Sequence, residues 1–114
     1  MNSRYEQQMK KGVLDMLVLA LLMEEEKYGY QIISELKEKS AELLCLKEGT
    51  LYPILYRMED DQLIRAEWSE AKGKEPSRKY YKITKSGIDT FIEMTTIWGT
   101  FENIVDDIIK TCKK

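Results

Sequence analysis

The residues whose types and spacing most suggest chemistry lie between Glu48 and Glu59, and that chemistry is hydrogen bonding rather than catalysis. The apolar side chains of this stretch have the spacing of a buried helical stripe: Leu51, Leu55 and Met58. Its other side chains fall on another face, where two tyrosines four residues apart lie one above the other: Thr50, Tyr52, Pro53, Tyr56 and Arg57. Hydroxyl and guanidinium groups beside a helix start suit the phosphates and base edges of nucleic acid. We therefore predict a recognition helix over 49–62, with an exposed face that has no core to fill.

The two ends of this helix are predicted to differ. An interior proline would remove a backbone hydrogen bond, so we expect the helix to begin no earlier than the segment from Gly49 to Pro53. The acidic run 59–61 should point away from phosphates, which leaves contact mainly to the first two turns. The plainer alternative for Tyr52 and Tyr56 is that they are exposed aromatic residues that merely flank the core.

A β-hairpin is predicted directly after this helix. Apolar and polar residues alternate from Ile64 to Ser69 and again from Arg78 to Thr84, which is typical of half-buried strands. The intervening residues 70–77 contain glycine, proline and lysines, as turns do.

The hairpin is also the most basic part of the chain. From Arg65 to Lys85 there are seven basic and three acidic residues, a local excess of 7 − 3 = +4. Lys72 and Lys74 near its tip are placed to contact phosphates and release counterions. The alternative is that this charge run is only a solvated face, and Arg78 could equally hold the hairpin against the acidic end of the helix.

The composition is that of an ordinary soluble domain. Of the 114 residues, 43% are hydrophobic and 33% are charged, and one domain of this size would gain stability from a partner subunit. The net charge is −2, from 18 basic and 20 acidic residues, so the total charge does not indicate nucleic-acid binding. The chain has no histidine, no Gly-rich phosphate loop and no nucleophile elbow, so we predict neither an enzyme nor a metal or cofactor site.

The cysteines and the longest apolar run indicate a cytoplasmic protein. Cys45 and Cys112 lack the paired spacing of a zinc or dithiol site, so we expect inert apolar positions, with redox sensing as the alternative. The run from Val13 to Met23 is eleven residues, well short of the ~20 that cross a bilayer. Acidic residues follow it instead of a small-residue cleavage site, which favours a buried helix over a signal peptide.

Two helices and a short strand are predicted before the recognition helix. Gly12 is expected to cap a helix that starts at Val13 and is apolar almost all round, as a central helix would be. Residues 28–30 turn the chain into a second helix, which should end over 40–42. The apolar residues 43–46 are predicted to form a small buried strand.

The last helix is expected to begin near Lys85, with Thr84 as its N-terminal cap. Its apolar residues repeat at alternating spacings of three and four, which predicts a coiled-coil-like dimer interface: Phe91, Met94, Trp98, Phe101, Val105, Ile108 and Cys112. Isoleucines beside this seam widen it, so the helix should pack on its own domain and on a second subunit. Gly99 costs about 1 kcal/mol relative to alanine inside a helix, which suggests either space for a ligand or tight packing across a twofold axis.

Four segments, in order over roughly residues 12–90, carry a family resemblance: Tyr28-Gly29-Tyr30-Gln31-Ile32, Glu48-Gly49-Thr50-Leu51-Tyr52-Pro53-Ile54-Leu55, Leu63-Ile64, and Gly73 followed by Arg78-Lys79-Tyr80-Tyr81-Lys82-Ile83-Thr84. Together they resemble the PadR family of bacterial transcriptional regulators. The implied fold is mainly α (α+β), a winged helix-turn-helix with a long C-terminal dimerisation helix. Residues 1–84 would form the DNA-binding domain, with 1–10 as an arm or short helix, and 85–114 would form the single dimerisation helix of the short subfamily.

The resemblance implies a homodimeric repressor of a palindromic operator, released when a phenolic or flat aromatic compound binds near the dimer interface. Together with the residue pattern it assigns DNA contact to these residues: Lys47, Gly49, Thr50, Tyr52, Pro53, Tyr56, Arg57, Lys72, Lys74 and Arg78. Trp98 matches the tryptophan that stacks on planar ligands in multidrug-sensing relatives, and it makes a candidate ligand site with Met94, Thr95 and Phe101.

A rival interpretation is a winged-helix module that presents the same aromatic face to another protein and does not bind DNA. The slight negative charge of the chain favours it. Strong salt dependence of binding to random duplex DNA would favour the regulator instead. The sequence leaves open the operator, the regulated genes, the inducer, and repression versus activation.

Overall fold

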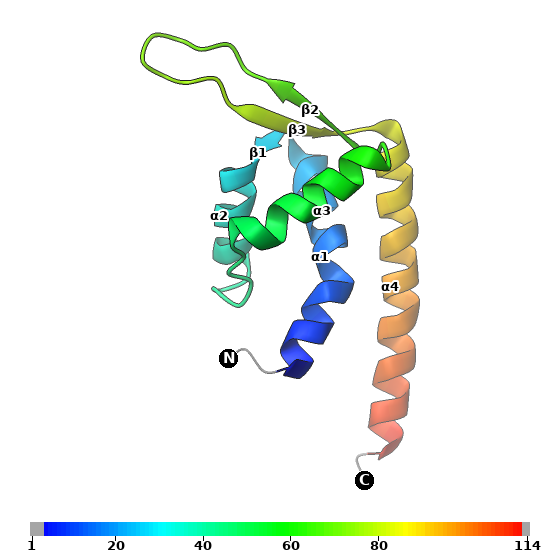
Figure 1. Ribbon diagram of the computed structural model, residues 1–114. Helices are drawn as coiled ribbons and strands as arrows, with labels where there is room; N and C mark the ends of the chain where they lie inside the picture. Colours follow the sequence, from blue (N-terminus) through cyan, green and yellow to red (C-terminus); the bar gives the residue numbers. More distant parts are fainter. Residues whose placement is uncertain (1–3, 113–114) are drawn as a thin grey trace.

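Helices form most of the molecule, and a small antiparallel sheet lies across one end of them (Figure 1). The structure is a computed structural model that describes residues 4–112. Its elements in chain order are α1 (Arg4–Glu24), β1 (Lys27–Tyr28), α2 (Gly29–Lys39), α3 (Glu48–Asp60), β2 (Ile64–Trp68), β3 (Lys79–Ile83) and α4 (Lys85–Cys112). The strand order is β1-β3-β2, so the hairpin of β2 and β3 is joined by a short strand that lies between α1 and α2 in the chain. This is a winged helix-turn-helix followed by a long helix, as predicted.

The hydrophobic core lies around the second half of α1, which contacts α2, β3 and α4. α1 contributes five buried residues: Leu14, Val18, Leu19, Leu21 and Leu22. The rest of the chain covers them with nine more: Ile32, Leu36, Leu44, Leu51, Ile54, Leu55, Met58, Ile64 and Tyr81. The buried stripe predicted for α3 is present, with Ile54 added to it. The central position predicted for the first helix follows from its nearly continuous apolar sequence.

The start of α1 differs from the sequence prediction. Gly12 does not cap a helix at Val13, because α1 begins at Arg4 and continues through Gly12 without interruption. Residues 4–11 are mostly good helix formers, and Glu6 and Lys10 form an i,i+4 ion pair at 3.5 Å. Of the two alternatives for residues 1–10, the described part from residue 4 onward is therefore helical.

Two further differences concern short segments. The predicted strand over 43–46 is wrong: Ala41 and Glu42 have φ values of 52° and 67°, and the chain then forms a loop in which only Leu44 is buried. Cys45 is exposed in this loop, and Cys112 is exposed on α4. β1 was not predicted, because two residues carry no periodicity and become a strand only by pairing with β3.

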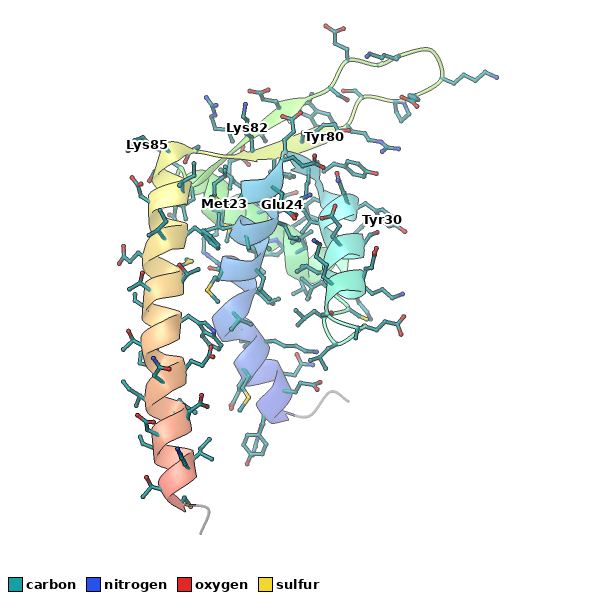
Figure 2. The ribbon with its side chains drawn as sticks, turned by 180° about the vertical axis from the view of Figure 1, so that it is seen from behind. Met23, Glu24, Tyr30, Tyr80, Lys82 and Lys85 are labelled. Atoms are coloured by element: carbon teal, nitrogen blue, oxygen red, sulfur yellow. The ribbon has the colours of Figure 1, made fainter. Side chains whose placement is uncertain are left out.

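The β2–β3 hairpin projects beyond the helices (Figure 1). Its register pairs Ile64 with Ile83 at the base and Trp68 with Lys79 at the far end. Ile64 is buried as the alternation predicted, but Trp68 is 68% exposed because the hairpin has left the core by that point. In Figure 2 the side chains of the loop beyond the strands point into solvent, and Gly73 makes the turn at its tip with φ of +57°.

α4 is joined tightly to the winged-helix domain at its start. The Thr84 hydroxyl oxygen accepts a hydrogen bond from the Gly87 amide at 3.0 Å, which confirms the predicted cap. The same hydroxyl approaches the Gln62 carbonyl oxygen at 2.7 Å, and the Thr84 amide donates to the Leu63 carbonyl at 3.0 Å. Lys85 begins the helix at the corner where the sheet meets it (Figure 2).

Beyond its start, α4 runs beside α1 and covers it with only part of its apolar surface. Phe91 and Met94 are half-buried against the core. The rest of the predicted seam is exposed, together with neighbouring isoleucines: Ile97, Trp98, Phe101, Ile104, Val105, Ile108, Ile109 and Cys112.

Candidate nucleic-acid interface

The first turns of α3 lie at the surface, as a recognition helix requires. Lys47 is the N-terminal cap residue, with extended backbone and no capping side chain, and its carbonyl accepts from the Thr50 and Leu51 amides at 2.9 and 3.1 Å. The helix includes Glu48, one residue earlier than expected, and Pro53 lies inside it on the exposed side. The amide that Pro53 lacks would have bonded to the carbonyl of Gly49, and both residues are exposed in the first turns of the helix.

The two tyrosines of α3 do not share one environment. Tyr56 is 52% exposed, whereas Tyr52 is half-buried and packs against the core. Their rings lie 6.0 Å apart, as the spacing of four residues predicted. The expectation that this face has no core to fill is therefore wrong for Tyr52, whose hydroxyl lies against Gly29 at the start of α2. Burial, with the nearby Glu48 and Tyr56, raises the pKa of Tyr52 and keeps its hydroxyl a donor.

Arg57 is held at the edge of the exposed face. Its guanidinium donates to the Asp15 carboxylate of α1, with an Nη2–Oδ1 distance of 2.6 Å. This exposed ion pair links the second half of α3 to α1. Asp15 therefore has a role that the sequence did not reveal, because the two residues are 42 positions apart.

The base of the wing lies beside α2 and α3. The Arg78 guanidinium stacks over the ring of Tyr28 at 4.5 Å, and Tyr28 in turn packs edge-on against Tyr80 at 5.5 Å. The predicted alternative role of Arg78, holding the hairpin against the acidic end of α3, belongs instead to Lys79, whose ammonium is 4.0 Å from Glu59.

The lysines of the wing tip are separate from the α3 surface. Lys72 and Lys74 are both exposed in the loop that extends beyond the sheet (Figure 1). The backbone of Lys72 pairs with that of Glu75 across the turn, which gives the tip a defined shape. The candidate contacts thus fall into two groups, one around α3 and one at the tip of the wing.

A buried lysine that sequence reasoning missed holds the start of α2. Lys27 is only 3% exposed, and its ammonium lies 3.0 Å from Glu35, 3.5 Å from Glu24 and 3.7 Å from Glu25. Burial would lower the pKa of Lys27, but the hydrogen bond and charge of Glu35 and the charges of Glu24 and Glu25 outweigh it and raise the pKa. The acidic triplet before Lys27 was the available signal.

Most of the candidate ligand residues lie around a cavity between α1 and α4. This cavity has a volume of about 250 Å³ and is lined by Lys11, Gly12, Asp15, Met16, Met94, Ile97, Trp98 and Phe101. It brings together three of the four predicted ligand residues. The fourth, Thr95, is exposed elsewhere on α4, where its hydroxyl donates to the Ile92 carbonyl at 3.0 Å.

A family model for PadR-like transcriptional regulators matches residues 18–93. The chain belongs to the PadR-like family. Members of this family are DNA-binding regulators of transcription rather than enzymes, so the predicted family, fold and absence of enzymatic activity are confirmed.

Several individual proteins are similar to this PadR-like chain. A PadR-like transcriptional regulator from Bacillus cereus is 34% identical with a TM-score of 0.78, covering 90% of this chain and 96% of its own. A transcriptional regulator from Clostridium thermocellum is 30% identical with a TM-score of 0.81, covering 88% and 96%. An uncharacterized protein from Lysinibacillus sphaericus is 34% identical over 98 residues, which are 84% of this chain and 87% of that protein.

Among residues 4–112, no helix is both long and apolar enough to span a membrane. The same residues contain no group of three or more side chains arranged to hold a metal ion.

Proposed function

We propose that this PadR-like regulator acts as a homodimeric repressor that recognises a palindromic operator in the cytoplasm. The observation that supports it most directly is that the exposed face of α3 and the basic base of the wing border one surface, where Tyr56 and Arg78 line the same cavity. A dimer would place two copies of α3 in successive major grooves, about 34 Å apart. The wings would then reach flanking phosphates.

The proposed contacts divide into two kinds. Side chains and backbone of the first turns of α3 would face the major groove: Lys47, Gly49, Thr50, Tyr52, Pro53, Tyr56 and Arg57. The wing would supply cations for the backbone: Lys72, Lys74 and Arg78. Because Arg57 is already paired with Asp15, it would contact DNA from the edge of this surface, with Tyr56 nearer its centre.

The exposed apolar side of α4 supports the dimer. Ile108 is 65% exposed and Phe101 58% exposed, and a contiguous apolar stripe of this length is unusual on a monomer. A second α4 packed along it would bury the seam that the sequence predicts: Phe91, Met94, Trp98, Phe101, Val105, Ile108 and Cys112. A methyl group added at Gly99 would meet no atom within 4 Å in one subunit, so the reason for a glycine there would be the partner helix.

The cavity beside Trp98 supports control by a small molecule. A planar aromatic or phenolic compound could stack on the indole, while Lys11 and Asp15 would meet its polar groups. Such a ligand would release the operator only if it binds the DNA-free arrangement of the dimer more tightly than the DNA-bound one. In a variant whose other tryptophan is replaced, Trp68→Phe, Trp98 fluorescence reports this binding directly; no change across a panel of such compounds would contradict an effector here.

The DNA proposal is tested by gel shift against the protein's own upstream DNA at low and moderate salt. Tyr56→Ala should weaken operator binding roughly ten- to hundredfold while leaving the dimer intact, since it removes exposed contacts only. Tyr52→Phe is the better variant at the half-buried tyrosine, because it removes the hydroxyl and keeps the packed ring. Lys74→Ala should weaken binding to all sequences and lower the salt slope by about one.

The outcome of the gel shift also decides between DNA binding and the rival function as a protein-interaction module. A specific, salt-sensitive complex would support the regulator. No complex with upstream DNA, and none with random duplex at low salt, would contradict DNA binding and favour a protein-interaction module.

A further inference from the structure

The surface between α2, α3 and the wing contains a second, larger cavity of about 660 Å³. Its lining is mostly aromatic and comes from all three elements: Tyr28, Gly29, Tyr30, Tyr52, Tyr56, Trp68, Ser77, Arg78, Lys79 and Tyr81. In Figure 2, Tyr30 projects from the outer side of α2 below the wing, at the edge of this region. Tyrosine hydroxyls next to two cations suit an anion with several hydrogen-bond acceptors.

Arg78 is the available cation in this cavity. Within residues 4–112 no carboxylate forms an ion pair with it, and its guanidinium carbon lies over the ring of Tyr28, 4.5 Å from the ring centroid. The backbone around it is fixed, because the Ser69 amide donates to the Arg78 carbonyl at 2.8 Å and the Arg78 amide donates to the Ser69 hydroxyl at 2.9 Å. A planar guanidinium that is positioned but not neutralised is suited to bidentate contact with an oxyanion.

The first turn of α2 adds backbone donors to the same cavity. Tyr28, its N-terminal cap residue, makes no capping hydrogen bond through its side chain. A methyl group on Gly29 would lie 2.4 Å from the Tyr52 hydroxyl, so the glycine lets that hydroxyl reach the helix start. The positive end of the helix dipole and the unbonded amides of the first turn favour a negative charge there.

Tyr81 provides an independent indication of a ligand. Its side chain is 1% exposed and lines the cavity, yet its hydroxyl has no hydrogen-bond partner among the described residues. Leaving a buried hydroxyl unpaired is costly, and an acceptor oxygen in the cavity would remove that cost.

We propose that this cavity binds one phosphate of the DNA backbone, held by Arg78, the first turn of α2 and the surrounding tyrosine hydroxyls. The inference rests on the proposed DNA binding and locates one of its contacts. The cavity is bordered by α3 and by the wing, and a strand whose groove receives α3 would pass between them. Exposed Trp68 at the rim would pack against the adjoining sugar.

The test uses operator duplexes in which one phosphate at a time is replaced by a neutral methylphosphonate, in both half-sites. For the wild-type protein, one position next to the α3 contact should lower affinity roughly ten- to hundredfold. Arg78→Gln should lower affinity for the unmodified operator by a similar factor. Methylphosphonate at that one position should then no longer weaken binding of the variant, whereas the effects at all other positions should remain. Tyr81→Phe should bind less tightly than wild type and reduce the effect of the same substitution.

Arg65→Gln is the matched control, because Arg65 is an exposed base-of-wing cation outside the cavity. It should keep the full sensitivity at the position that Arg78→Gln loses. If Arg78→Gln remains sensitive at every position, or if its affinity is unchanged, the phosphate site is wrong although DNA binding stands. If the wild-type protein binds no duplex at all, the proposed function fails, and this site fails with it.

Discussion

Replacing Gly87 with alanine should misfit the joint between the winged-helix domain and α4. The added methyl carbon would lie 2.1 Å from the Leu63 carbonyl oxygen and 2.7 Å from the side chain of Ile83. A carbon–oxygen contact relaxes to about 3.3 Å, so the backbone of α4 would have to move away by more than about 1 Å. The atom in the way belongs to the backbone and cannot rotate aside.

The cost can be assembled from three contributions. Overpacking of this severity costs about 3 kcal/mol. The Leu63 carbonyl also accepts from the Thr84 amide at 3.0 Å, and weakening that bond costs about 1 kcal/mol. The better helix propensity of alanine returns about 1 kcal/mol. Gly87→Ala should therefore lower the free energy of unfolding by about 3 kcal/mol, which corresponds to a fall in Tm of about 12 °C.

Thermal unfolding followed by circular dichroism at one fixed protein concentration measures this difference. Gly12→Ala is the matched control, since Gly12 lies inside α1 and a methyl group there meets nothing within 4 Å. That variant should gain about 0.5 to 1 kcal/mol from helix propensity alone. A Gly87→Ala protein that melts within about 2 °C of wild type, beside a stabilised Gly12→Ala protein, would refute the close approach of α4 to Leu63.

Three other predictions concern stability and association. Burial raises the pKa of Tyr81 to about 12, so below pH 10 both the folded and the unfolded chain keep its proton, whereas between about pH 10 and 12 only the folded chain does. Over that window the free energy of unfolding of the wild type should fall by about 2 to 3 kcal/mol more than that of Tyr81→Phe. Equal pH profiles of the two proteins in urea titrations would contradict this. Asp15→Asn and Arg57→Gln should each cost no more than about 1 kcal/mol, and a double-mutant cycle should return a favourable coupling; additivity would mean the pair contributes nothing. Gly99→Ala should weaken the dimer in sedimentation experiments although it favours the helix itself; tighter association would show that no partner backbone approaches Gly99.

Local patterns in the sequence predicted the parts of the fold that local physics determines. The stripe of Leu51, Leu55 and Met58 is buried because three- and four-residue spacing places side chains on one side of any helix. Thr84 caps α4 because a threonine hydroxyl before a helix can reach an amide three residues later. The hairpin followed from alternation in both strands and from the turn residues between them.

The features that could not be predicted depend on contacts between distant segments. Tyr52 is half-buried because Gly29 leaves room for its hydroxyl. Gly29 belongs to α2, so the residue pattern of α3 could not predict this contact. β1 exists through its pairing with β3, and its two residues have no period of their own. The ion pair of Asp15 with Arg57 crosses from α1 to α3, and only the packing angle of the two helices brings them together.

The candidate site was predicted in its residues more than in its arrangement. Tyr56 and Arg78 were singled out separately, and the structure places them on one cavity. The contributions of Tyr28 and Tyr81 were missed, although both lie in the segments that carry the family resemblance. Their place in the family motifs was the available signal, but their roles depend on the three elements that form the cavity.

The hydrogen bonds around Thr84 couple the start of α4 to the segment that precedes the wing. Thr84 bonds to Gln62 and Leu63 in the turn that follows α3 and to Gly87 in α4, so one residue links the segment after α3 to the start of the long helix. With 28 residues at about 1.5 Å each, α4 is about 42 Å long. A tilt of roughly 5° applied along it would shift the far end by about 4 Å, which is about a third of the ~12 Å width of the major groove. In the proposed dimer, a small molecule that tilts α4 would therefore change the fit of both subunits to DNA without unfolding either one.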